Sequence, residues 1–289
     1  MAVEAHPMND IAASTPVARG RAASFHEWPL VVFTTLAIMG AGTLTAPLVA
    51  GLVSTSTAAA QPVMWLGSVL LAAGLAVSLA HLGRPVRAPL AAARLGRSPL
   101  STEVVLGGLT LSSGLLVALR PYELPAVTLL TALLAVSFLA ALGLVYRLPG
   151  QQTWHGAVVF VPLTMGLGFG ALTLAGMWDG SVVTVGAVAA IVLAADTVLF
   201  LIRRFTLAWP RVPIVPRHPA LYEHRNLLLA SRFALVAVVP GMLVLGGLTK
   251  GAAGSLGLGI LLDRLMFYGF ASQHTTEAEI ASVEGSLAN

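Results

Sequence analysis

The chain has 289 residues, of which 57% are hydrophobic and only 10% charged, with a formal net charge of +4. Soluble domains carry about 25% charged residues, so this composition excludes a soluble globular protein and indicates a chain embedded in a bilayer. No basic stripe alternates with aromatic residues, which argues against nucleic-acid binding. The lack of cysteine excludes a disulfide, a thiolate-bound metal and a cysteine-ligated iron–sulfur cluster in this chain.

The order of apolar segments predicts an all-α integral membrane protein. Residues 1–25 are rich in Ala, Ser and Pro and are predicted to be a mobile tail, and residues 272–289 a polar tail. A run of about 20 apolar residues can cross a bilayer as a helix. Eight runs within residues 26–271 meet this rule, and we expect them to form two four-helix bundles. The expected spans are 28–52, 61–81, 100–119, 124–146, 155–177, 181–202, 227–249 and 252–271.

Arginines mark one side of this arrangement. Twelve of them, Arg203 included, lie in the N-terminal tail or in the connectors after the second, fourth and sixth spans. The opposite connectors hold only Arg120 and Lys250. The positive-inside rule places the arginine-rich side, and with it both termini, in the cytoplasm. An arginine-rich face that docks an acidic partner would give the same distribution, and the sequence does not separate these two causes.

Polar chemistry is concentrated in the connector between the second and third spans, HLGRPVRAPLAAARLGRSPLSTE, which runs from His81 to Glu103. Ser98 and Pro99 are typical of a helix N-cap and its first position. Glu103 would then lie about 6 Å inside the third span. An acid there either complements the helix dipole or is a functional ionisable group within the membrane.

His81 ends the second span, and Gly83 and Pro85 favour a tight turn that brings this end close to Glu103. A histidine and a carboxylate can hold the two hydroxyls of a hydroquinone and accept its protons. The alternative is an interfacial histidine bonded to a loop carbonyl. Other polar residues on this face either mark the membrane interface or contact the same ligand. They are Arg84, Arg87, His26 and Glu27.

Four further charged residues lie within the later spans. Asp196 is in the middle of the sixth span, and Arg232 in the seventh is either its counter-ion or interfacial. In the eighth span, Asp263 and Arg264 form either a structural ion pair or part of a proton path. These residues would do the work in the alternative class of protein, a multi-pass transporter or proton-conducting module. No histidine lies in mid-span, so a bis-histidine haem is not expected.

Five segments taken together resemble the membrane anchor subunit of dimethyl sulfoxide reductase-type molybdoenzymes. The broader relatives of that family are the eight-span quinol-oxidising anchors of polysulfide reductase-like complexes. One departure is that relatives often carry an acid at the position of Ile260, whereas the nearest acid here is Asp263. The five segments are HEWPL (26–30), HLGRPVRA (81–88), SPLSTEV (98–104), TW (153–154) and RLMFYG (264–269).

This resemblance implies a subunit of the prokaryotic inner membrane that carries out the quinol half-reaction only. It would oxidise menaquinol or ubiquinol and pass the electrons to a four-cluster ferredoxin-like iron–sulfur subunit. That partner would supply a molybdopterin catalytic subunit, which reduces an acceptor such as dimethyl sulfoxide. The resemblance also implies that His81 and Glu103 bind the quinol.

Overall fold

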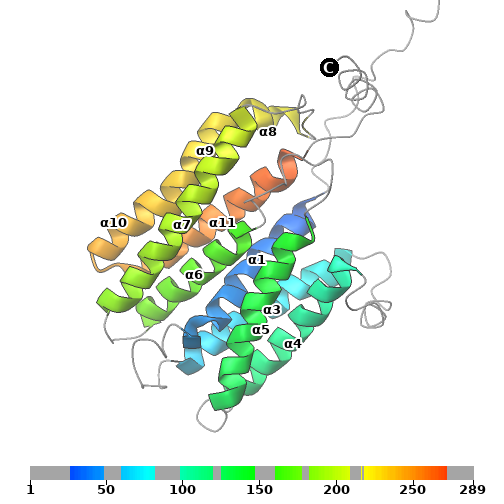
Figure 1. Cartoon of the computed structure of the whole chain (residues 1–289), viewed down its shortest axis with the longest axis vertical. Coiled ribbons are helices and arrows are strands. Elements are labelled where there is room, and N and C mark those ends of the chain that lie inside the picture. The colour runs from blue at the N-terminus through cyan, green and yellow to red at the C-terminus, as the bar shows by residue number, and fades with distance from the viewer. Residues whose placement is uncertain are drawn as a thin grey trace, which may run out of the picture.

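The computed structural model describes residues 27–48, 60–81, 98–119, 125–146, 160–177, 182–208, 216 and 218–271, and its elements are helices (Figure 1). Both predicted tails lie outside these ranges. The helices are α1 (Trp28–Leu44), α3 (Ala60–His81), α4 (Pro99–Leu119), α5 (Pro125–Leu144), α6 (Val161–Met177), α7 (Val182–Ala208), α8 (Pro219–Glu223), α9 (Arg225–Phe233), the π-helix η4 (Ala234–Val238), α10 (Val239–Leu245) and α11 (Thr249–Gly269).

The prediction of an all-α membrane fold is confirmed. A helix lies over each of the eight predicted spans, and five helices are long and apolar enough to cross a membrane. α6 is apolar but has 17 residues, whereas α7 and α11 each contain three charged residues. The count of eight spans therefore stays a prediction. The five are Trp28–Leu48, Gln61–Ala80, Pro99–Leu119, Pro125–Leu144 and Arg225–Leu245.

α1 lies at the centre of the helix array. It packs against α3 and α5 on one side and against α6 and α11 on the other (Figure 1). Much of its buried surface consists of small side chains, including Ala37, Gly40, Ala41 and Gly42. Because this helix contacts members of both predicted groups, the described helices do not confirm a division into two separate four-helix bundles.

α1 and α6 approach each other closely at two glycines, Gly42 and Gly170. A Cβ atom added at Gly42 would lie 2.1 Å from the carbonyl oxygen of Gly166, and one added at Gly170 would lie 2.0 Å from the carbonyl oxygen of Gly42. Both obstacles are backbone atoms, so only glycine fits at these two positions. Small residues allow such contact between helices in lipid, where no hydrophobic effect drives the helices together.

The seventh predicted span is a composite of α9, η4 and α10 that contains Pro240. In the π-helical segment the N–H of Val239 bonds to the carbonyl of Ala234, five residues earlier. Continuing that pattern, the next N–H would bond to the carbonyl of Leu235, but proline has no N–H. The Ser255 hydroxyl of α11 donates to this carbonyl instead, at 2.9 Å. The serine thus satisfies a backbone acceptor that the proline leaves open.

We expect Ser255→Ala to lower the free energy of unfolding by about 1–3 kcal/mol, because it leaves a poorly solvated carbonyl without a donor. Ser137→Ala is the matched control, since the Ser137 hydroxyl bonds within its own helix to the carbonyl of Leu133 on an exposed face. Thermal unfolding of the detergent-solubilised protein measures both. Equal melting temperatures for the two variants would contradict the proposed role of Ser255.

The two sets of helix ends differ in chemistry. α1, α4, α6 and α9 begin, and α3, α5, α7 and α11 end, at the same end of the array (Figure 1). This is the end from which the arginine-bearing connectors leave the helices, and we refer to it as the arginine-rich end. Residues of α1 close to Trp28 lie at this end, so position along α1 serves as a measure of depth.

Candidate functional site

Glu103 is a buried acid in the first turns of α4, with 4% of its surface exposed. It belongs to an inward-facing stripe with Gly107, Thr110 and Gly114, which follow at the spacing of one helix face. A Cβ at Gly107 would touch Phe138 of α5 and Leu75 of α3, so this stripe packs between those two helices. Among the described residues, no cation lies within ion-pair distance of the Glu103 carboxylate.

The register of α3 against α4 brings His81 to the level of Glu103. Leu75 of α3 lies opposite Gly107 of α4, and the two helices are antiparallel neighbours. His81 is six residues beyond Leu75, and Glu103 is four residues before Gly107, so both are displaced toward the arginine-rich end by about 9 Å and 6 Å. The His81 side chain lies outside the described residues, as do Arg84, Arg87 and His26.

Two tyrosines lie beside this acid. The hydroxyl of Tyr268, at the end of α11, donates to the hydroxyl of Tyr146, just after α5, at 2.6 Å. Both rings make edge-to-face contacts with Phe267, with centroids 5.1 Å and 5.2 Å apart. The site therefore contains more polar groups than the connector sequence between the second and third spans indicates.

The tyrosines also join the site to α1. Val31 packs with Phe267 and Tyr268, and Leu30 and Tyr146 border the same small apolar cluster. Hence the phenols lie level with the first turn of α1, which is also the depth of Glu103.

One turn nearer the surface, Glu27 and His218 form a pair. The Glu27 carboxylate lies 3.3 Å from Nε2 of His218, and both side chains are mostly buried. The backbone N–H of His218 donates to the carbonyl of Gly269, the residue after Tyr268. The predicted partnership of Glu27 with the site thus has a structural counterpart, although its partner is a histidine of the sixth connector.

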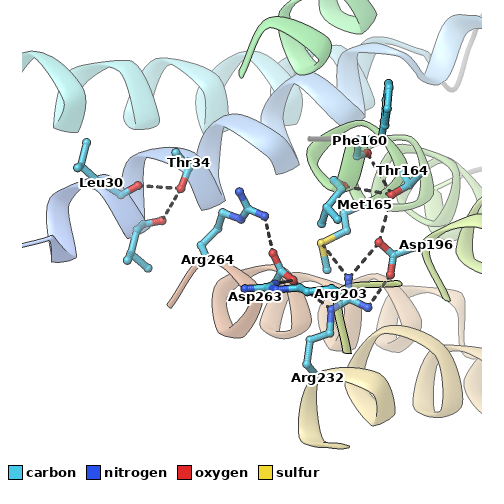
Figure 2. Close-up of polar contacts among 12 residues, drawn as sticks. Leu30, Thr34, Phe160, Thr164, Met165, Asp196, Arg203, Arg232, Asp263 and Arg264 are labelled. Carbon is cyan, nitrogen blue, oxygen red and sulfur yellow. Dashed lines mark hydrogen bonds and ion pairs between the residues drawn. The ribbon is translucent and has the colours of Figure 1, made fainter. Parts of the chain in front are cut away.

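A fully buried ion cluster lies deeper in the bundle than the tyrosines (Figure 2). Asp263 of α11 accepts from Nη1 of Arg203 at 3.0 Å and from Nε of Arg232 at 3.2 Å, and it pairs with Arg264. The carboxylate of Asp196 in α7 pairs with two nitrogens of Arg232: Nη1 lies 2.7 Å from Oδ2, and Nη2 donates to Oδ1 at 3.0 Å. Three arginines and two aspartates leave a net charge of +1.

Neighbouring side chains complete the cluster. The Thr164 hydroxyl of α6 donates to Asp196 at 3.1 Å (Figure 2). The guanidinium of Arg232 lies 5.2 Å from the Phe200 ring, and that of Arg264 lies 4.6 Å from the Phe267 ring. These rings stabilise the excess positive charge through cation–π interaction. The cluster adjoins the tyrosine pair through Arg264, because the Phe267 ring that its guanidinium covers also contacts both tyrosines.

The buried charged side chains in the described ranges lie between the arginine-rich end and the middle of the bundle: Met165, which contacts Arg232, precedes Gly166, and Gly166 lies against Gly42 of α1. Deeper in the described bundle, the buried polar side chains carry only hydroxyls, as at Thr43, Ser68 and Thr173. A transmembrane proton path needs ionisable groups or water through the whole depth. This distribution weighs against the alternative class, a transporter or proton-conducting module.

The comparison with known proteins agrees with the membrane fold. The family model described as DMSO reductase anchor subunit (DmsC) matches residues 22–270. The chain belongs to this family. The match covers every residue of the site and of the ion cluster described above.

Three relatives of this anchor subunit belong to anaerobic dimethyl sulfoxide reductases. The C subunit from Escherichia coli (strain K12) is 28% identical over 239 residues, which cover 73% of the present sequence and 82% of that protein. The YnfH subunit of the same strain is 31% identical over 144 residues, 45% of the present sequence and half (50%) of that protein. The C subunit from Haemophilus influenzae is 31% identical over 159 residues, or 52% and 57%.

Family membership and the apolar helices confirm a multi-pass membrane anchor. Two of the predicted ion pairs are also confirmed: Arg232 is the counter-ion of Asp196, and Asp263 pairs with Arg264. The interpretation of Arg203 as a connector arginine is wrong, because α7 extends to Ala208 and buries it against Asp263. Its spacing of seven residues from Asp196 is the signal that places both on one helix face.

The tyrosine pair is the feature that the sequence did not indicate. Tyr146 and Tyr268 are separated by 122 residues, so no local spacing connects them. The quoted segment RLMFYG contains Tyr268, but only the packing of α11 against α1 and the end of α5 brings the second phenol to it.

Proposed function

We propose that the protein is the quinol-oxidising membrane subunit of a dimethyl sulfoxide reductase-type molybdoenzyme complex. A menaquinol or ubiquinol would bind at the arginine-rich end, between the end of α3 and the start of α4. The observation that carries this proposal is the burial of Glu103 without an ion-pair partner among the described residues. An unpaired acid inside a membrane is costly and is by default a functional group.

The chemistry divides between electrons and protons. A quinol that becomes a quinone loses two electrons and two protons. The carboxylate of Glu103 accepts the proton of one hydroxyl, and the imidazole of His81 accepts the proton of the other. The electrons pass to the iron–sulfur partner and from it to the molybdopterin subunit. Arg84, Arg87 and His26 belong to the surroundings of the quinol head in this proposal.

The location of the site sets where the partner must dock. The hydrocarbon core is roughly 30 Å thick, so a quinol at the arginine-rich end is close only to a cluster held on that side. The iron–sulfur subunit therefore docks on the arginine-rich connectors. By the positive-inside rule this side and both termini are cytoplasmic. In the same proposal all eight helical segments span the prokaryotic inner membrane. We include α7 and α11 among the spanning helices because their buried charges neutralise one another inside the bundle.

The test replaces Glu103 with glutamine in the assembled complex. Glutamine keeps the size and hydrogen-bonding groups of the side chain but accepts no proton, so we expect quinol-driven reduction of dimethyl sulfoxide to fall by about 10²-fold or more. Turnover driven by a reduced viologen, which donates directly to the partner subunits, should stay unchanged.

Thr110→Val is the matched control, because Thr110 is buried on the same face of α4 two turns deeper. It should retain quinol-driven turnover. Unchanged turnover of Glu103→Gln with quinol would remove this acid from the reaction and with it the proposed site.

A further inference from the structure

We propose that Tyr146 and Tyr268 form a relay that carries the proton received by Glu103 to the Glu27–His218 pair at the arginine-rich surface. This inference rests on the proposed quinol oxidation and adds the exit route of one of its two protons. Neither phenol belongs to the connector between the second and third spans.

The geometry of the pair suits proton transfer. The two hydroxyl oxygens are 2.6 Å apart, a short distance for a bond between two hydroxyls. A phenol has one hydrogen to donate and two lone pairs to accept, so it can take a proton on one side and release its own on the other. Phe267 lies edge-on to both rings and shields the pair from lipid.

One end of the relay adjoins the acid. Position 107 of α4 packs against Phe138 of α5, and these neighbours are antiparallel. One turn before position 107, Glu103 thus approaches the last residues of α5, and Tyr146 follows that helix directly.

The other end of the relay approaches the surface. Tyr268 precedes Gly269, whose carbonyl binds the backbone N–H of His218. Val31, packed on Tyr268, lies one helical turn after Glu27 and bonds through its N–H to the Glu27 carbonyl at 3.0 Å. The Glu27–His218 pair is therefore one turn from the phenols, on the side of the aqueous phase.

The ion cluster gives the relay its direction. The cluster has a net charge of +1 and begins one turn deeper than the phenols, at Arg264, whose guanidinium lies over the Phe267 ring. A buried cation repels a mobile proton strongly because the surroundings have a low dielectric constant. An excess proton on the tyrosine pair is therefore driven toward Glu27 and His218 and away from the bundle core.

The proton balance of the step is simple. The Glu103 carboxyl gives up the proton it received from the quinol, and the Tyr146 oxygen takes it. The Tyr268 hydroxyl, which donates to Tyr146 in the structure, turns and passes its hydrogen to the surface pair and so to water. Tyr146 then passes its own hydrogen to the Tyr268 oxygen. Each phenol gains one proton and loses one, and no electron moves through this series of oxygens.

The test uses Tyr146→Phe and Tyr268→Phe in the assembled complex, because each removes one oxygen and keeps the ring. We expect the quinol-driven kcat to fall about tenfold or more, while KM for a short-chain quinol changes less than twofold. The solvent deuterium isotope effect on this kcat should rise, because proton release becomes limiting. Viologen-driven turnover should not change.

Tyr222→Phe is the matched control, since Tyr222 packs edge-on to Phe270 at the same end of the bundle but outside the relay. It should behave as the unaltered complex. If both relay variants keep the quinol-driven kcat and isotope effect while Glu103→Gln loses activity, the relay is wrong and the quinol site stands. If Glu103→Gln is also fully active, the proposed function itself fails. A parallel loss of viologen-driven turnover would show a defect of assembly and overturn the relay.

Discussion

Replacing Asp263 with alanine is expected to remove the anchor subunit from the membrane. Asp263 pairs with all three arginines of the ion cluster, Arg203 and Arg232 at 3.0 Å and 3.2 Å and Arg264. Without it, three buried guanidiniums share the single remaining carboxylate of Asp196, and the net charge rises from +1 to +2. Removing one partner of a buried ion pair costs about 3–5 kcal/mol. Because whole domains are stable by only about 5–15 kcal/mol, we expect most of the folded protein to be lost.

Immunoblotting of membranes and thermal unfolding of the solubilised complex would measure this loss. The control is the double variant Arg203→Leu with Asp263→Ala, which restores the net charge of +1. Arg203 has Asp263 as its ion-pair partner in the described structure, so the double variant should accumulate to a higher level than the single one. The account of the cluster is contradicted if Asp263→Ala accumulates normally, or if the double variant is no better than the single one.

Gly170→Ala is expected to separate α1 from α6. The added methyl group would lie 2.0 Å from the carbonyl oxygen of Gly42, far inside van der Waals contact, and no movement of a side chain relieves a clash with backbone. Overpacking of a well-packed core costs about 1–3 kcal/mol and occasionally more. We expect the upper part of that range, because two helix backbones must move apart in the centre of the array.

Gly108→Ala is the opposite control, since a Cβ at this position of α4 meets nothing within 4 Å. Alanine in a helix is favoured over glycine by about 0.5–1 kcal/mol, so this variant should melt at the same or a higher temperature. Differential scanning fluorimetry of the two variants measures the difference. If Gly170→Ala has the same melting temperature as the unaltered protein, α1 and α6 are not in backbone contact.

The sequence predicts the helices well where a local signal exists. Ser98 and Pro99 give the start of α4, and Pro125 begins α5 one residue from the predicted start of that span. The predicted end of the first span at residue 52 is not tested, because the described helical segment reaches Leu48 and residues 49–59 lie outside the described ranges. At Thr45 the hydroxyl and backbone N–H both bond to the carbonyl of Gly42, a break in the regular helix that hydropathy does not indicate.

The site is predicted only in part, for a related reason. Glu103 and His81 flank one connector, so the sequence itself brings them to one end of the bundle. The partners that surround Glu103 come from α5 and α11, and their register depends on packing at glycines and small side chains. Long-range contacts of this kind, such as Tyr146 with Tyr268 or Arg203 with Asp263, have no local signature in the sequence.

The central proposal, that a quinol is oxidised beside Glu103, is tested most directly by a single anaerobic mixing experiment. Purified complex is mixed with excess short-chain quinol, and the reduction of its iron–sulfur clusters is followed by absorbance or electron paramagnetic resonance. We expect rapid reduction in the unaltered complex and in Thr110→Val, and reduction about 10²-fold slower in Glu103→Gln, although dithionite reduces all three equally. Equally rapid reduction by quinol in Glu103→Gln would contradict the proposal.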